Sequence, residues 1–281
     1  MAVSMEQIKE LREKTGVGLM ECKKALSETN GDIEASIRLL KERGAITAAK
    51  KTDREVKEGS IGFYINDAKN EVACIELHCE TDFVAKNELF VNLSKEIAKI
   101  SASVDNASVD SVLNSKGANG DTVQAMITEG IQKWGENTVL ASVKAMKTDG
   151  FFGSYVHFNN KLVTIVEFNV KPNDKCLEIA NQIAMHIASE KPLALNREGV
   201  DAAAVAEQKE IFAKQVEDKP ENMREKIIEG KMNSWYSESV LIDQKLFTDN
   251  KVTIKSLVEE IGKEAGATAE IKSFSIISLG V

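Results

Sequence analysis

Apolar residues in the first fifty positions recur at helical spacing and fall into three short runs. Ser4 and Gln7 have the spacing of a capping box at the start of the first run, and Asp32 takes the N-cap position of the third. From residue 45 to 58 the periodicity is lost among charged residues, as is typical of a linker that is at most partly helical. The pattern predicts a three-helix N-terminal module with its linker over residues 1–54.

Two segments in the middle of the chain share one order of strand, turn, strand and helix. The matching positions are Gly59, Ser60, Val72, Glu76 and Ile97 in the first segment and Gly153, Ser154, Val163, Glu167 and Ile183 in the second. We infer two related halves, each an antiparallel sheet with helices on one face. The first half is predicted over residues 55–146, and the second over residues 147–198 and 239–281.

The second half is interrupted by two long helical runs over residues 199–238, which Asp218-Lys219-Pro220 joins. Such runs predict an antiparallel helical hairpin, and an arm of about 18 residues would project about 27 Å. A hairpin inserted in this way either packs on the body or serves as an assembly device. The predicted fold class is therefore α+β, with a helical module before the two halves and a hairpin inserted in the second.

The connection between strand and helix in the first half, Thr81 to Asn87, is unusual because it carries Phe83 and Val84. The corresponding connection in the second half, Lys171 to Asp174, is an ordinary polar turn, so the fold can close this connection without apolar residues. Two interpretations remain open from spacing alone. Phe83 either staples the helix start behind Thr81 as N-cap, or it is presented to another molecule.

Composition narrows the classes of function. The formal charge of −8 argues against a general nucleic-acid binder. Four cysteines and three histidines show no metal-ligand spacing, so no metal or other cofactor is expected. The first residues lack the apolar core of a signal peptide, and no later stretch is long and apolar enough to span a bilayer. These features predict a soluble cytoplasmic protein.

Motifs of catalysis and nucleotide binding are missing from the sequence. It contains no phosphate-binding GxxxxGK[ST] loop, no GxGxxG motif at a helix start, no nucleophile elbow and no HExxH. Glu76 and Glu167 recur at matching strand positions, where a structural role on a sheet face is the better explanation. We therefore expect a protein that is not an enzyme.

Seven short motifs, spread over nearly the whole chain, resemble the bacterial elongation factor Ts family of guanine-nucleotide exchange factors. They are Leu11–Gly16, Cys22–Leu26, Gly31–Glu34, Thr81–Asn87, Met185–Ala188, Lys219–Glu221 and Glu225–Lys231. The resemblance implies a ubiquitin-associated-like N-terminal domain, two pseudo-repeated core halves and a coiled-coil dimerisation hairpin. It also implies elongation factor Tu as partner, a homodimer or two-plus-two complex through the hairpin, and no direct nucleotide binding.

The resemblance further implies which residues touch elongation factor Tu. The loop residues Thr81, Asp82, Phe83 and Val84 would disturb the Mg²⁺ site of the partner, with Phe83 as a wedge. Further contacts are implied at Leu11, Arg12, Thr15, Gly16 and Val17, and at His157 near the partner's third domain. Longer family members continue into a C-terminal helix that adds contacts, whereas this sequence ends at Val281, so those contacts are not expected here.

Two alternative functions remain from the sequence. The three-helix module could make the chain a non-catalytic scaffold, which would lose its partner entirely without residues 1–52. The chain could also be an RNA-binding translation protein, which would show a steep dependence of RNA affinity on salt. The net negative charge and the lack of interleaved aromatic and basic residues argue against RNA binding.

Overall fold

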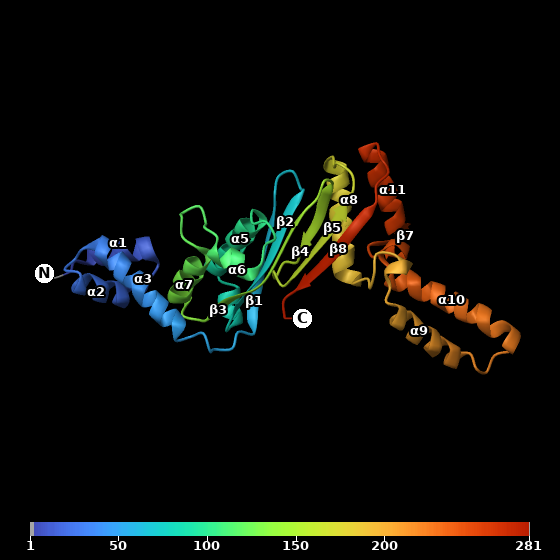
Figure 1. Ribbon diagram of the computed structural model, residues 1–281, viewed down its shortest axis with the longest axis horizontal. Helices are drawn as coiled ribbons and strands as arrows, with labels where there is room; N and C mark the ends of the chain where they lie inside the picture. Colours follow the sequence, from blue (N-terminus) through green and yellow to red (C-terminus); the bar gives the residue numbers. More distant parts are fainter. Residues whose placement is uncertain (1–2, 281) are drawn as a thin grey trace.

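The computed structural model describes residues 3–280 as an elongated molecule with three parts in line. The three-helix module lies at one end, a helical hairpin lies at the other, and two sheets occupy the middle (Figure 1). Helices cover the outer side of each sheet, as the α+β class requires. The α+β fold predicted from the sequence is confirmed.

The N-terminal module consists of three capped helices around a small apolar core. They are α1 (Met5–Thr15), α2 (Leu19–Glu28) and α3 (Ile33–Ala49). Ser4 and Gln7 form both hydrogen bonds of the predicted capping box, and Asp32 caps α3 through the amide of Ala35. Helix α3 runs through the first part of the segment expected to be a linker, because the Ala-rich sequence favours helix and α3 packs on α7 (Val123–Trp134). The side chain of Gln132 donates to the carbonyl oxygen of Leu40 at 2.5 Å across this contact.

The core contains two three-stranded antiparallel sheets that share an apolar layer. One sheet orders β1 (Glu58–Ile65), β2 (Glu71–Cys79) and β3 (Thr138–Lys147), and the other orders β4 (Phe151–Val156), β5 (Leu162–Phe168) and β8 (Ile271–Ser278). Alternate residues face opposite sides of each strand, so Cys74 and Ile165 meet between the sheets while Leu77 and Phe168 face the helices. The covering helices are α5 (Glu88–Ala102), α7, α8 (Asp174–Glu190) and α11 (Ile254–Ala265).

Strand pairing shows how the two halves correspond. The register shifts after Glu76 in β2 and after Glu167 in β5, so these two glutamates take equivalent places. Ile61 pairs with Glu76 and Phe152 pairs with Glu167, which makes Gly62 the counterpart of Gly153. The match of Gly59 with Gly153 made from the sequence is therefore wrong by three residues. A Cβ at Gly62 would lie 2.0 Å from the carbonyl oxygen of Ser94, and one at Gly153 would lie 2.6 Å from Ala180, so a helix backbone crosses both glycines.

The hairpin and its connections complete the chain. Its arms are α9 (Ala202–Gln215) and α10 (Glu221–Ser239), and the first is shorter than the predicted 18 residues because the chain leaves the helix at Val216. The remaining short elements are α4 (Asp82–Ala85), α6 (Val109–Asn114), η1 (Arg197–Gly199), η2 (Leu241–Asp243), β6 (Lys245–Leu246) and β7 (Asp249–Thr253). The β6–β7 hairpin was not predicted from the sequence, and its first strand has only two residues.

A buried histidine connects α8 to this small hairpin. The Nδ1 of His186 accepts a hydrogen bond from the amide of Phe247 at 3.2 Å, so its Nε2 must donate to the side-chain oxygen of Gln244 at 2.9 Å. This arrangement requires the neutral imidazole. Burial lowers the pKa of His186 below its ordinary value of 6.5, against a smaller opposing effect of the bond to Gln244.

We expect the free energy of unfolding to decrease as the pH falls below about 6.5. The unfolded chain then binds a proton that His186 in the folded chain resists, and the slope is at most about 1.4 kcal/mol per pH unit. Above the unfolded pKa both states are neutral and the full stability is kept. Urea midpoints measured between pH 5.5 and 7.5 check this, with His186→Gln as the comparison. A slope that persists in that variant would place the titration elsewhere.

Candidate protein-binding site

The turn that carries Phe83 is an addition to the repeated fold. Asn87 caps α5 and Asn173 caps α8, and the buried Cys79 corresponds to the buried Val170 in the strand register. Seven residues, 80–86, join strand to helix in the first half, whereas only 171 and 172 do so in the second. The additional residues form the single helical turn α4.

A carboxylate from a distant loop holds α4 in place. Glu136 lies between α7 and β3, and its two oxygens accept hydrogen bonds from the amide of Thr81 at 2.9 Å and from the hydroxyl of Thr81 at 2.6 Å. The hydroxyl of Thr81 in turn caps α4, because it accepts a hydrogen bond from the amide of Val84 at 3.5 Å. Val84 and Ala85 are buried in the core beneath the turn. The turn is therefore fixed both by charge-assisted hydrogen bonds and by packing.

Phe83 is presented to solvent by this fixed turn. Its side chain is 82% exposed, so the interpretation that Phe83 staples the start of the helix is wrong. Beside it, Asp82 pairs with Lys86 at 2.7 Å, and this hydrogen bond is the main cause of a lowered pKa of Asp82. An exposed pair of this kind adds little stability. The turn thus exposes a large apolar side chain next to a carboxylate, with no benefit to the isolated fold.

The four loop residues named from the sequence divide into two pairs. In the free chain Thr81 is bonded to Glu136 and the side chain of Val84 is buried, so these two hold the turn in position. Asp82 and Phe83 point outward. Nothing in the local pattern marks Glu136 as an anchor, because 55 residues separate it from Thr81. The one local signal is the position of Glu136, an acidic residue directly after the helix end at Gly135.

The N-terminal candidates lie on a separate surface at the end of the molecule (Figure 1). Leu11 and Val17 are buried in the core of the module, whereas Arg12 is exposed. Thr15 donates to the carbonyl oxygen of Leu11 at 2.7 Å, and Gly16 ends α1 with a left-handed φ of 69°.

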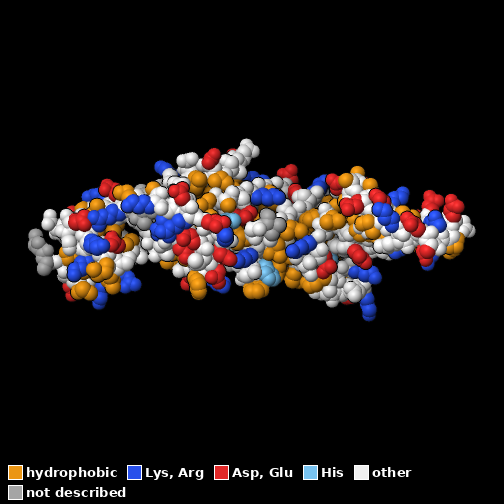
Figure 2. Space-filling view, turned by 90° about the horizontal axis from the view of Figure 1, so that it is seen from below, with side chains coloured by type: hydrophobic (Ala, Val, Ile, Leu, Met, Phe, Trp, Pro, Cys, Tyr) orange, Lys and Arg blue, Asp and Glu red, His pale blue; other side chains and the backbone are white. Residues whose placement is uncertain are grey.

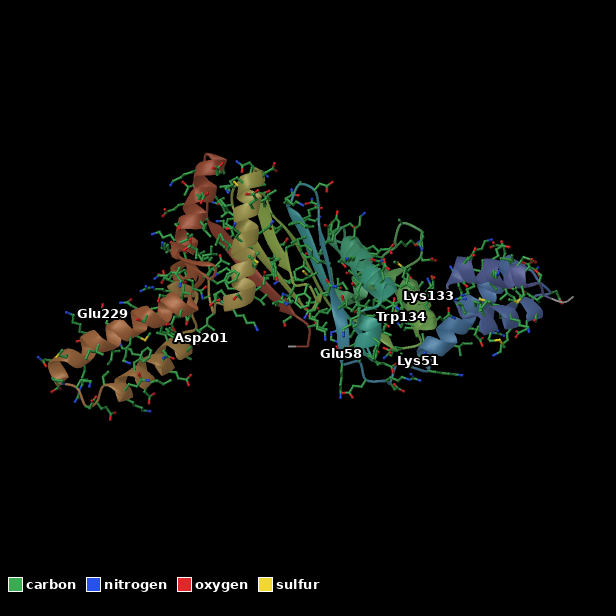
Figure 3. All side chains as sticks on the ribbon, turned by 180° about the vertical axis from the view of Figure 1, so that it is seen from behind. Lys51, Glu58, Lys133, Trp134, Asp201 and Glu229 are labelled. Carbon is green, nitrogen blue, oxygen red and sulfur yellow. The ribbon has the colours of Figure 1, made fainter. Side chains whose placement is uncertain are left out.

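The exposure of two apolar residues of that module was not predicted from the sequence. Met20 is 64% exposed, and Leu19 beside it is also exposed. Both follow the left-handed Gly16, where the chain turns away before α2 begins. The module joins the core where Lys51 donates to the carbonyl oxygen of Gly135, close to the labelled Lys133 and Trp134 in Figure 3.

His157 lies in the turn between β4 and β5. Its Nδ1 is 2.9 Å from the hydroxyl of Tyr155, and its ring is 4.5 Å from that of Phe158. The turn contacts the start of β1, where Lys161 pairs with Glu58 at 2.6 Å. Glu58 is labelled at the lower edge of the core in Figure 3. The turn therefore lies beside β1, the strand against which α4 also packs.

The described residues offer little else for reactive chemistry. Burial raises the pKa of the Cys79 thiol to about 12, which makes it a poor nucleophile. Between residues 3 and 280 no group of His, Cys, Asp and Glu side chains is arranged to hold a metal ion. Within the same range no helix is both long enough and apolar enough to cross a bilayer.

Comparison with known proteins decides the family. The family described as Elongation factor TS matches residues 80–281, which include the α4 turn, β3 of the first sheet, the whole second sheet and the hairpin. The chain belongs to the elongation factor Ts family. The family predicted from the sequence motifs is thereby confirmed.

Individual members of the elongation factor Ts family align over almost their full length. Elongation factor Ts of Halothermothrix orenii is 38% identical, and the alignment covers 100% of this chain and 93% of the relative. Elongation factor Ts of Clostridium botulinum strain Eklund 17B is also 38% identical, over 97% of this chain and 91% of the relative. The ATCC 19397 strain of the same species has a relative that is 37% identical. Membership of the elongation factor Ts family supports a role in translation elongation.

Proposed function

We propose that this chain is a guanine-nucleotide exchange factor that acts in the cytoplasm on elongation factor Tu. It binds the partner with GDP, disturbs the Mg²⁺ and phosphate site, and promotes GDP release so that GTP can bind. The observation that carries the proposal is the additional turn α4, which holds an exposed Phe83 on a rigid support. Membership of the elongation factor Ts family supplies the partner.

The mechanism depends on Phe83 as a wedge. Nucleotide bound through a phosphate loop and Mg²⁺ requires accurate placement of the metal ligands. Insertion of Phe83 into an apolar slot beside that site gains about 1.5–3 kcal/mol from burial and displaces the elements that support the metal. Because Glu136 and the packing of Val84 already order the turn, little conformational entropy is lost when it binds.

Each residue of the loop has its own part in this proposal. Phe83 and Asp82 touch the partner, whereas Thr81 and Val84 keep the turn in position. His157 and the exposed residues near Arg12 would add contacts outside the metal site. No covalent bond is made or broken by this chain, so exchange is not an enzymatic reaction in the usual sense.

Exchange requires reciprocal coupling between GDP and the factor. If the factor weakens GDP binding by some ratio, GDP weakens factor binding by the same ratio. The partner therefore passes through a nucleotide-free complex, from which GTP displaces the factor.

The rate of GDP release from elongation factor Tu tests the proposal. A fluorescent GDP analogue bound to elongation factor Tu is chased with excess GDP, with and without the full chain. Catalytic amounts of the chain should accelerate release. Binding without acceleration would favour a non-catalytic scaffold that docks through the three-helix module, and no binding at all would refute both functions.

We also propose that the hairpin joins two copies of this chain, in a homodimer or a two-plus-two complex. No residue of α9 is fully buried, and Ile211 and Met223 expose apolar side chains on the two arms. A groove of about 650 Å³ runs along the arms and is lined by Val205, Ile228, Met232 and Tyr236 among charged residues. A groove with apolar residues from both arms and a charged surround is suited to a second helical arm.

Charges placed on the hairpin should prevent this self-association. In the double variant Ile211→Lys and Met223→Lys, burying two ammonium groups would cost more than the apolar contact gains. We expect sedimentation velocity to show a monomer at concentrations where the unmodified chain forms dimers. Met20→Lys, at the opposite end of the molecule, is the matched control and should leave the dimer intact. A dimer that persists in the double variant would place the interface elsewhere.

A further inference from the structure

Phe158 is the most exposed large apolar side chain of the described residues, at 88%. It lies at the tip of the turn between β4 and β5, next to His157. The wedge mechanism above does not use it, and none of the family motifs in this sequence includes it.

The fold of the turn does not require an aromatic residue at this position. In the second half, the amide of His157 donates to Leu162 and Asn160 takes a left-handed φ of 53°. In the first half, the amide of Asn66 donates to Glu71 and Lys69 has a φ of 57°. The two turns are therefore equivalent, and the counterpart of Phe158 in the first half is Asp67, an exposed polar residue. A solvated aspartate serves this position equally well, so Phe158 is not explained by folding.

The turn is held on the same part of the core as the wedge. The amide of Ile61 donates to the carbonyl oxygen of Asn160 at 2.7 Å, and Lys161 pairs with Glu58 at 2.6 Å. Both contacts fix the turn to β1, against which α4 also packs. The turn also acts on α4 electrostatically. The pKa of Asp82 is lowered first by Lys86 and also, to a smaller extent, by Lys161 of the turn.

Phe158 is also pre-oriented. Its ring lies 4.5 Å from the ring of His157 at an interplanar angle of 51°, and the Nδ1 of His157 lies 2.9 Å from the hydroxyl of Tyr155. Figure 2 shows hydrophobic side chains next to a histidine in the middle of the molecule, among charged side chains. An aromatic group with a supported neighbour loses little entropy on binding, which is typical of an anchor residue.

We propose that Phe158 is a second anchor for elongation factor Tu, which fills an apolar recess of the partner apart from the slot of Phe83. The inference rests on the proposed function and assigns binding and displacement to different residues. Phe158 belongs to the second half and its turn makes no bond to α4, so it holds the factor on its partner without moving the metal site. Phe83 alone performs the displacement.

Concentration dependence of GDP release separates the two anchors. With full chains, Phe158→Ala and Phe158→Asp should raise the factor concentration that gives half-maximal release by about 10- to 100-fold, while the maximal rate stays within about twofold. Phe158→Asp installs the residue of the equivalent turn in the first half. The matched control is Asp67→Ala in that turn, which should change neither value.

Each other result overturns the inference. An unchanged half-maximal concentration removes Phe158 from the interface, and if Phe83→Ala still abolishes release, the proposed function stands without it. A lower maximal rate would assign displacement to Phe158 as well. Altered sedimentation of the free chain, with unchanged release, would show that Phe158 contacts a second copy. If the unmodified chain does not accelerate release, the proposed function and this inference fail together.

Discussion

Phe83→Ala is expected to reduce the maximal rate of GDP release from elongation factor Tu by at least about tenfold. The substitution removes the only large apolar group that α4 presents, so the partner's metal site would no longer be displaced. The free energy of unfolding should change by less than about 0.5 kcal/mol, because the side chain is exposed and makes few contacts in the free chain. Stopped-flow release at saturating factor and urea unfolding measure the two quantities.

Leu193→Ala provides the control, because Leu193 is also an exposed large apolar residue but lies in the connection to the hairpin. It should leave both the release rate and the stability unchanged. If Phe83→Ala releases GDP at the unmodified maximal rate, Phe83 has no part in displacement. Exchange would then have to come from other contacts of the core.

Glu136→Ala is expected to affect both stability and exchange. It removes both acceptors of Thr81, including one that bonds its backbone amide, and half-buried charge-assisted hydrogen bonds contribute about 1.5–3 kcal/mol each at most. The free energy of unfolding should fall by about 1–3 kcal/mol. Maximal release should fall several-fold as well, because Phe83 would be carried by a turn that must be ordered on binding.

Glu136→Gln distinguishes positioning from charge. The amide keeps one acceptor oxygen, so it should recover part of the stability and part of the exchange rate. Glu129→Ala, which breaks only a surface pair with Lys133, is the matched control and should change neither by much. Full exchange in Glu136→Ala, together with the expected loss of stability, would show that the position of Phe83 does not depend on this carboxylate.

The elements predicted correctly from the sequence are those that depend on residues close together in the chain. The caps at Ser4 and Asp32 depend on residues three positions away, and both are present. The two sheets and their helices follow from apolar periodicity together with turn residues. The β6–β7 hairpin was missed because a strand of two residues is too short for any period.

The parts that were wrong or open depend on contacts between distant residues. The Gly-Ser pairs do not mark equivalent positions in the two halves, because the true correspondence is set by the helices that cross Gly62 and Gly153. The choice between a staple and a presented side chain at Phe83 could not be made from spacing. What decides it is the bond between Thr81 and Glu136 and the burial of Val84, and both are tertiary contacts.

The apolar layer between the two sheets has a mechanical consequence. Ile61, Cys74, Phe152 and Ile165 belong to one buried cluster, so the halves cannot slide or hinge past one another without opening it. The separation between the turn of Phe83 and the turn of Phe158 is therefore nearly incompressible. In the proposed complex Phe158 would anchor the factor, and this spacing would set where Phe83 meets the partner. A stiff core would keep Phe83 in place under load, so that the proposed displacement takes place in the partner and not in the factor.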